Sequence, residues 1–106
     1  MKQQSKDILP EIKLALRISH SKLDDDIIAN IDAAIAEMIR RGTPATAARN
    51  LENSDILAAI RLYCRKEYWI NDAARYERLQ KAWDVKIDEI RRHYRDDDGR
   101  TDPDTS

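Results

Sequence analysis

The chain has 106 residues, which is enough for one hydrophobic core and too few for two domains. It contains no Phe, two Gly, three Pro and little Val or Thr, so its composition disfavours a β-sheet and predicts an all-α fold. Although 37% of the residues are charged, the net charge is −1, which excludes a general attraction to nucleic acids or anionic membranes.

Cysteine content and hydropathy indicate the cellular setting. The single Cys64 has no partner for an internal disulfide, which favours a reduced, intracellular environment. The polar residues 1–6 are not followed by a long apolar run, so we expect no signal peptide. Charges interrupt every window of about 18 residues, so we expect neither a transmembrane helix nor a membrane partner.

Charge is distributed unevenly along the chain. The net charge is +3 over residues 1–22, −3 over 23–41, +1 over 42–71, +2 over 72–95 and −4 over 96–106. Acidic and basic segments therefore alternate. We expect ion pairs between helices of one subunit or between neighbouring subunits.

The first part of the chain predicts a short helix and then a longer one. The short helix covers roughly residues 8–18, with Asp7 as its cap and Pro10 in its first turn, where a missing N–H costs little. The acidic run 24–26 provides an N-cap and favourable charge for the second helix, which Gly42 ends. Its apolar stripe, at spacings of three and four, is Ile27, Ile28, Ile31, Ile35, Met38 and Ile39.

The third helix is the most apolar segment of the chain. After a loop with one helical turn at Ala45–Arg49, it spans about residues 55–70 with Asn53 or Ser54 as its cap. Its main stripe includes Ile56 and Ile60, and further apolar residues extend around its girth. Such a helix is either buried in its own domain or packed against another molecule.

A fourth helix begins after Asn71-Asp72, extends to about Arg95 and precedes an acidic tail. Its apolar stripe is Tyr76, Leu79, Trp83, Ile87, Ile90 and Tyr94. Residues 96–106 lack large apolar side chains, and we expect them to be disordered in the free protein. The sequence thus predicts one domain over residues 1–95, a bundle of about four helices with a short first helix, and a disordered acidic C-terminal tail.

No pattern in the sequence indicates an active site or a metal centre. His20 and His93 lie far apart, and neither belongs to a His-Glu-x-x-His arrangement. Cys64 lacks a Cys-x-x-Cys partner and is expected to be a small core residue. The Asp clusters at 24–26 and 96–98 lack the spacing of an EF-hand loop. We therefore expect a non-enzymatic protein without a cofactor or metal.

Two patterns bear on macromolecular binding. Arginines flank the Gly-containing turn before the third helix, as in a helix–turn–helix, but that helix opens with Asp55 followed by apolar residues. A recognition helix instead presents basic and amide side chains, so sequence-specific DNA binding is disfavoured. Trp69 and Ile70 fall off the main stripe of the third helix, and an exposed apolar cluster at a helix end is a candidate interface.

Four segments occur in a characteristic order. They are residues 12–18 (IKLALRI), residues 24–42 (from DDDII to EMIRRG), residues 55–63 (DILAAIRLY) followed by Tyr68, and residues 76–79 (YERL) with a late Tyr94. Over residues 8–95 this order resembles the small phage head–tail connector proteins, also called adaptor or head-completion proteins. The family often has Gly after the aromatic end of the third helix, where this chain has Trp69-Ile70-Asn71, so the angle to the fourth helix stays open.

The resemblance implies a structural virion protein without enzymatic activity. Such subunits form a homo-oligomeric ring, commonly of twelve copies, beneath the portal protein of a filled capsid. The ring extends the DNA channel, lies close to packaged DNA without reading its sequence, and docks the next connector or tail-completion protein. It would assemble in the cytoplasm of the bacterial host and reside at the head–tail interface of the virion.

Several residues are candidates for contact with a neighbouring subunit or the portal, and the acidic tail is expected to make such contacts too. They are Arg61, Leu62, Arg65, Trp69, Ile70, Arg91, Arg92, Tyr94 and Arg95. The leading alternative function is a small helical regulator or antitoxin-like protein that dimerises through its third and fourth helices. A DNA-binding accessory protein is a third and weaker one.

Overall fold

The computed structural model describes the backbone of residues 4–100 and the side chains of residues 4–94. Its helices are η1 (Ser5–Ile8), α1 (Leu9–Leu16), α2 (Asp24–Arg40), α3 (Ala45–Ala48), α4 (Ser54–Tyr68) and α5 (Ala73–Arg100). No strand occurs within residues 4–100, so the predicted small all-α bundle is confirmed. The single turn α3 is also confirmed, and η1 is a 3₁₀ turn that extends the short first helix at its N-terminal end.

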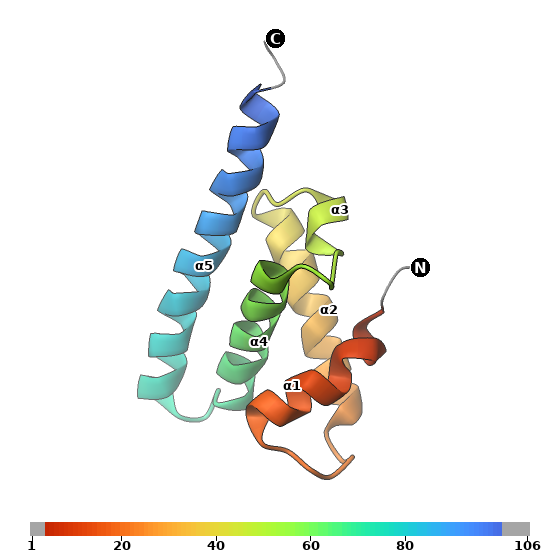
Figure 1. Ribbon diagram of the computed structural model, residues 1–106. Helices are drawn as coiled ribbons and strands as arrows, with labels where there is room; N and C mark the ends of the chain where they lie inside the picture. Colours follow the sequence, from red (N-terminus) through yellow and green to blue (C-terminus); the bar gives the residue numbers. More distant parts are fainter. Residues whose placement is uncertain (1–3, 101–106) are drawn as a thin grey trace.

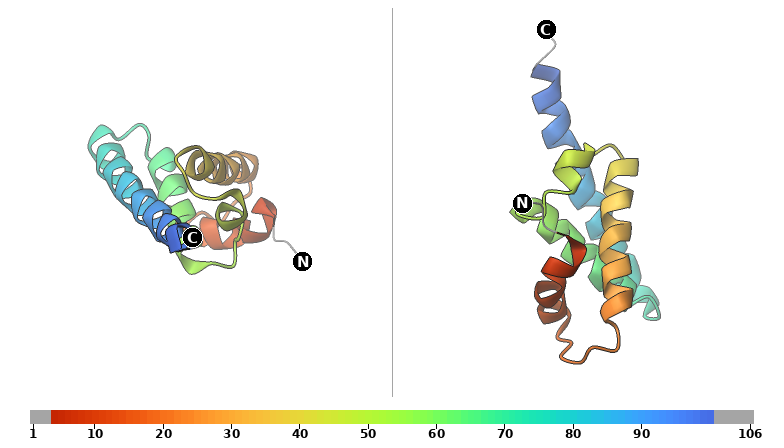
Figure 2. Two further views of the ribbon diagram at one scale, coloured as in Figure 1. Left: turned by 90° about the horizontal axis from the view of Figure 1, so that it is seen from above. Right: turned by 90° about the vertical axis from the view of Figure 1, so that its right-hand side faces the viewer.

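The apolar girth of α4 is explained by its position between other helices. It packs against α5, α2 and α1, with α5 to its left and α2 behind it in Figure 1. The view from above in Figure 2 shows the same order. α5 runs back antiparallel to α4 (Figure 1). The two are therefore separate helices joined by a reversal of the chain. Most of the apolar surface of α4 is therefore buried within the chain itself.

The predicted N-caps of the first two main helices are wrong. Asp7 lies inside η1, where its carboxylate accepts a hydrogen bond from the Gln4 N–H at 2.8 Å. Leu23 is the N-cap residue of α2 and makes no side-chain capping bond, so residues 24–26 form the first helical turn. Helical structure begins before Asp7 in the first case and at Asp24 itself in the second, so neither is an N-cap residue. The acidic run therefore acts through the positive end of the helix dipole.

Gly42 ends α2 as predicted, for two physical reasons. Its φ of 114° is a conformation that side chains with a Cβ rarely adopt. In this conformation the N–H groups of Gly42 and Thr43 donate to the carbonyls of Ile39 and Met38 at 3.1 and 2.9 Å. A Cβ on Gly42 would also lie 2.6 Å from the Cδ of Arg91, so α5 fills the space beside it.

The hydrophobic core forms where the main helices meet. Its buried residues are Ile8, Ile12, Ile18, Ile27, Ile31, Ala34, Met38, Ala48, Leu51, Ile56, Ala59, Ile60, Cys64, Trp83, Ile87 and Ile90. The predicted stripes supply most of the large ones. The buried Ala34 and Ala48 were not predicted, because small residues leave no mark in a pattern of large apolar side chains. Ile28 and Ile35 of the α2 stripe are only partly buried.

Ion pairs join neighbouring helices, as the alternating charge predicts. Among the described side chains, the pairs between different parts of the fold are Lys13–Asp24 at 2.8 Å, Arg61–Glu11 at 3.0 Å, Arg41–Asp84 at 2.8 Å and Lys86–Asp55 at 3.4 Å. Each such pair at a surface contributes about 1 kcal/mol or less. The alternating charges thus form ion pairs within the chain. Ion pairs between neighbouring chains stay a prediction.

The helix α5 is longer than predicted. It continues as helix from Ala73 to Arg100, past the expected end at Arg95, because adding a residue to an existing helix costs far less than starting one. Residues 101–106, the rest of the predicted acidic tail, lie outside the described residues. Within the described part of the chain, no helix combines the length and the apolar character needed to cross a membrane.

Candidate interaction surface at the α4–α5 turn

The turn between α4 and α5 is closed by hydrogen bonds of the backbone. Trp69 is the C-cap residue of α4, and its N–H donates to the Arg65 carbonyl at 3.1 Å. The N–H of Asp72 donates to the Trp69 carbonyl at 2.9 Å, and the Asp72 carboxylate accepts from the Arg75 N–H at 3.1 Å. The predicted break at Asn71-Asp72 is confirmed, and Asp72 satisfies a free N–H in the first turn of α5.

Three consecutive large side chains at this turn remain in contact with solvent. The exposed fractions are 43% for Tyr68, 38% for Trp69 and 53% for Ile70. The ring of Tyr68 meets that of Trp69 edge-to-face at 5.3 Å, and the Arg75 guanidinium lies 4.0 Å from the centroid of a Trp69 ring. We call Tyr68, Trp69, Ile70, Asp72 and Arg75 the α4–α5 tip. The predicted exposure of Trp69 and Ile70 is confirmed; their role as an interface is not tested by it.

Two of the other three candidates from α4 contact residues of their own chain. Arg61 is paired with Glu11 of α1 at 3.0 Å, and Leu62 packs against the hydrophobic core. Arg65 is exposed. Arg61 and Leu62 therefore hold α4 in place, which the sequence could not show because their partners lie in distant parts of the chain.

The candidates near the end of α5 also contact their own subunit. Arg91 and Arg92 both pair with Asp88, the latter through its Nε at 3.3 Å, and together they lower the pKa of that carboxyl. The hydrogen bond from Arg91 is the main cause of this shift. The Tyr94 hydroxyl accepts a hydrogen bond from the Asn53 side-chain amide at 3.4 Å, and its ring packs on the core.

The structure therefore separates the nine candidates rather than gathering them. Trp69 and Ile70 lie at the α4–α5 turn, at the lower left of Figure 1, whereas residues 91–94 lie toward the upper end of α5. The side chain of Arg95 lies outside the described residues. Among the candidates whose side chains the structure describes, Trp69 and Ile70 are the exposed apolar ones, so the α4–α5 tip is the better candidate interface.

Sequence reasoning missed a buried lysine next to this tip. Lys66 of α4 is only 4% exposed, although lysine is rarely buried. Its ammonium lies 2.7 Å from the Glu67 carboxylate, 4.0 Å from the centroid of the Tyr63 ring and 5.3 Å from that of Tyr76. These contacts replace the hydration that a buried cation loses. In the sequence, Tyr63, three residues before Lys66, is the one nearby residue that indicates this burial. Tyr76 belongs to the next helix, so its contact with Lys66 cannot be read locally.

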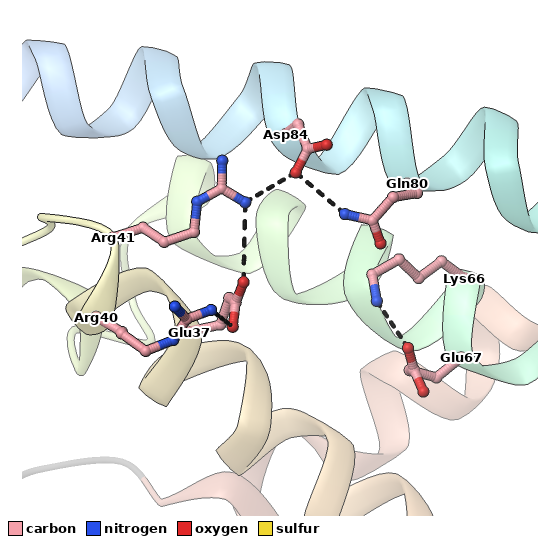
Figure 3. A network of polar contacts seen from close by, with 7 residues as sticks. All are labelled: Glu37, Arg40, Arg41, Lys66, Glu67, Gln80 and Asp84. Atoms are coloured by element: carbon pink, nitrogen blue, oxygen red, sulfur yellow. Dashed lines mark hydrogen bonds and ion pairs between the residues drawn. The ribbon is translucent and has the colours of Figure 1, made fainter.

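A second set of polar contacts ties α5 to the end of α2 (Figure 3). The guanidinium of Arg41 lies 2.8 Å from Asp84 and 3.8 Å from Glu37, and the Gln80 amide donates to Asp84 at 3.1 Å. Within α5, no residue before Trp83 is fully buried. In the first turns of α5, Tyr76 and Arg75 make cation–aromatic contacts with Lys66 and Trp69, and Asp84 adds the ion pair with Arg41.

Among residues 4–94, the side chains that could form a reactive or metal-binding site do not cluster. Cys64 is 1% exposed, and burial raises the pKa of its thiol to about 12, as expected of a small core residue. Burial likewise raises the pKa of the Tyr63 hydroxyl, against the lowering effect of Lys66. Within residues 4–94, no three His, Cys, Asp or Glu side chains converge in a way that could hold a metal ion.

Two grooves of the described surface involve α2. The larger, about 600 Å³, lies between η1, α2 and the chain around α3, and its lining includes Ile28, Asp32, Ile35, Arg49 and Leu51. We call it the η1–α2 groove. The smaller, about 420 Å³, lies beside α4, and its lining residues are Leu16, Leu23, Asp26, Ile27, Ala29, Asn30, Cys64, Glu67 and Tyr68. We call it the α2–α4 groove. It adjoins the α4–α5 tip, whereas the lining of the η1–α2 groove shares no residue with the tip.

Comparisons with known proteins identify no relative of this chain. No family model, no curated protein and no solved structure matches it. Function must therefore be inferred from the arrangement of residues in the chain itself.

Proposed function

We propose that this protein is a structural subunit of a phage or prophage virion, a head–tail connector that forms a ring beneath the portal protein. The ring would extend the DNA channel and present a docking surface for the next connector or tail-completion protein. It would surround packaged DNA without reading its sequence. The observation that carries the proposal is the exposed Tyr68-Trp69-Ile70 run at the end of a central helix whose other apolar side chains are buried or partly buried.

The subunit already has a closed core that does not use this run. Ile56, Ile60 and Cys64 fill the interior face of α4 and are at most 1% exposed. Three consecutive large side chains left in water cost free energy, so an assembled state that covers them is favoured. A ring subunit needs such a patch because a heterologous contact joins two different surfaces of each copy.

The far end of the molecule supports a second contact. In Figure 1, the C-terminal part of α5 extends beyond the ends of the other helices. A helix that projects from the bundle offers a surface to a platform such as the portal or to the next connector. A connector requires contacts of both kinds, sideways to its neighbours and along the channel axis to other components.

The test is the stoichiometry of the complex with the portal protein of the same phage or prophage. The two proteins are co-expressed, purified by a tag on the portal, and analysed by native mass spectrometry and electron microscopy. The proposal expects a ring of about a dozen copies of this chain on the portal. A stable dimer that never associates with portal would contradict it and favour the regulator or antitoxin-like alternative.

The DNA-binding alternative has a separate test. Titration of a short labelled duplex at several salt concentrations measures affinity and sequence preference together. The connector proposal expects only weak binding that does not depend on sequence. A clear preference for one sequence would contradict it.

A further inference from the structure

The η1–α2 groove has an apolar floor and a charged rim. Ile28 and Ile35 on one face of α2 are partly buried, and Leu51 lies beside them. Asp32 stands between the two isoleucines along α2 and accepts a hydrogen bond from the Ser5 hydroxyl of η1. Arg49 lines the other side. The volume of about 600 Å³ is within the range that receives ligand-sized groups.

The α4–α5 tip carries the side chains that most often anchor protein interfaces. Trp, Tyr and Arg are the residue types enriched at the energetic centres of such contacts. Here the Arg75 guanidinium is stacked on Trp69 at 4.0 Å and is also 3.8 Å from the Asp72 carboxylate. The tip is therefore pre-organised, with an apolar centre and one charge of each sign at its edge.

The tip and the groove carry side chains of matching kinds. The tip offers Trp69 and Ile70 for the apolar floor, Arg75 for Asp32, and Asp72 for the cations Arg49 and Lys6 of the lining. Complementary charges of this kind set the register of an interface more than its affinity.

The two surfaces also lie on different sides of the subunit. The α4–α5 turn lies at the lower left of Figure 1, and η1 and α3 lie toward the right. In the right-hand view of Figure 2, η1 and α3 are in front and the α4–α5 turn is behind. A contact between tip and groove therefore joins different surfaces of two copies, and such a head-to-tail contact gives a ring when the rotation between neighbours closes.

We propose that the α4–α5 tip of one subunit inserts into the η1–α2 groove of a second copy of this chain. The inference rests on the proposed ring, because it names the two surfaces by which neighbouring subunits meet. Trp69 and Ile70 then cover the exposed parts of Ile28 and Ile35. The stacked Arg75 reaches Asp32 at the rim.

Site-directed cross-linking tests the contact. Ile70→Cys places a thiol on the tip, and Ala36→Cys places one at the exposed edge of the groove lining. The two variants are mixed at high protein concentration and treated with a short bis-maleimide. Native Cys64 is retained, because it is buried and the raised pKa of its thiol keeps it unreactive. We expect a cross-linked heterodimer in the mixture and none with either variant alone.

Two further variants sharpen the result. A chain carrying both cysteines should give a ladder of multimers, because each copy then links to two neighbours. Val85→Cys is the matched control, since Val85 is 60% exposed on α5 but lies outside the tip. Mixed with Ala36→Cys, it should give no heterodimer. Arg75→Glu should reduce the Ile70–Ala36 product at least severalfold, and Asp32→Lys in the partner should restore it.

Several outcomes would overturn the inference. Cross-linking of Ile70→Cys to itself without the heterodimer would indicate a two-fold dimer, with the tip in the adjacent α2–α4 groove. The absence of any product specific to Ile70 and Ala36 would also contradict the contact. A ring on the portal without this cross-link would overturn the inference and leave the connector proposal intact. A cross-linked ladder without any ring on the portal would support the contact and count against the connector.

Discussion

The two tryptophans of this protein have opposite surroundings. Trp83 of α5 is 1% exposed, and the Tyr63 ring meets it edge-to-face at 5.0 Å. Trp69, the C-cap residue of α4, is 38% exposed, and its ring contacts Tyr68 and Arg75 of its own chain. The difference shows that the same residue type can stabilise the fold at one position and remain available for a partner at another.

The reason lies in their positions relative to the apolar stripes. Trp83 belongs to the stripe of α5, four residues before Ile87, and faces α4. Trp69 comes after the last helical residue of α4, where the backbone turns away from the core. Substitutions of Trp83 and Trp69 test this contrast directly, with the largest and the smallest expected change in the free energy of unfolding. Three substitutions at Lys66, Gly42 and Asn53 are expected to have intermediate effects.

The largest loss is expected for Trp83→Ala. Removing a fully buried Trp leaves a cavity and destroys the contact with Tyr63, so unfolding in urea should show a loss of about 3–5 kcal/mol. Val85→Ala, on the exposed side of the same helix, is the matched control and should change stability by at most about 0.5 kcal/mol. Similar effects of the two substitutions would show that Trp83 is not a core residue.

Lys66→Ala should cost about 2–3 kcal/mol, because it leaves the Glu67 carboxylate without its partner and removes the buried stem between two Tyr rings. Lys66→Met in combination with Glu67→Gln keeps the volume and removes both charges. This double variant should recover at least half of the loss in the same denaturation experiment. No recovery would mean that the ammonium itself, through its ion pair with Glu67 and its contacts with the two Tyr rings, stabilises the fold.

Gly42→Ala should cost about 1–3 kcal/mol, since the backbone conformation at φ 114° is strained for any residue with a Cβ. The new Cβ would also collide with the stem of Arg91. A thermal unfolding series with Arg91→Ala in both backgrounds separates the two causes. If the collision contributes, Gly42→Ala is less harmful when Arg91 has been truncated.

Asn53→Ala should cost about 1 kcal/mol, because the Asn53 side chain accepts hydrogen bonds from the N–H groups of Asp55 and Ile56 at 2.8 and 3.2 Å. Asn53→Asp keeps these bonds and should retain most of the stability measured by denaturation. A full loss with Asp would point instead to the contact between the Asn53 amide and Tyr94.

Trp69→Ala should change the stability of the isolated subunit least, by about 0.5–1 kcal/mol, since it loses only the contacts with Arg75 and Tyr68. Its effect on assembly should be much larger, with the ring on the portal reduced or absent in native mass spectrometry. Unfolding of the isolated subunit by this substitution would place Trp69 in the core and remove the basis of the proposed interface.

The candidate surface was only partly accessible from the sequence. The exposure of Trp69 and Ile70 followed from their departure from the stripe of α4, and the structure agrees. Arg61 and Tyr94 were proposed as contacts between subunits, yet they bind Glu11 and Asn53 of their own chain. Polar side chains near a helix end look alike in sequence, because their partners lie many residues away.

By itself, the sequence determined the helices, their order and most of their large core residues. Helical periodicity, the Asn53 cap and the Gly42 stop act over a few residues and can be read locally. Only the tertiary structure decided which charged side chains are buried. Lys66 is enclosed because Tyr76 of the following helix lies across it, and the second role of Gly42 appears only where Arg91 covers it. These features depend on how helices meet, which local residue patterns do not record.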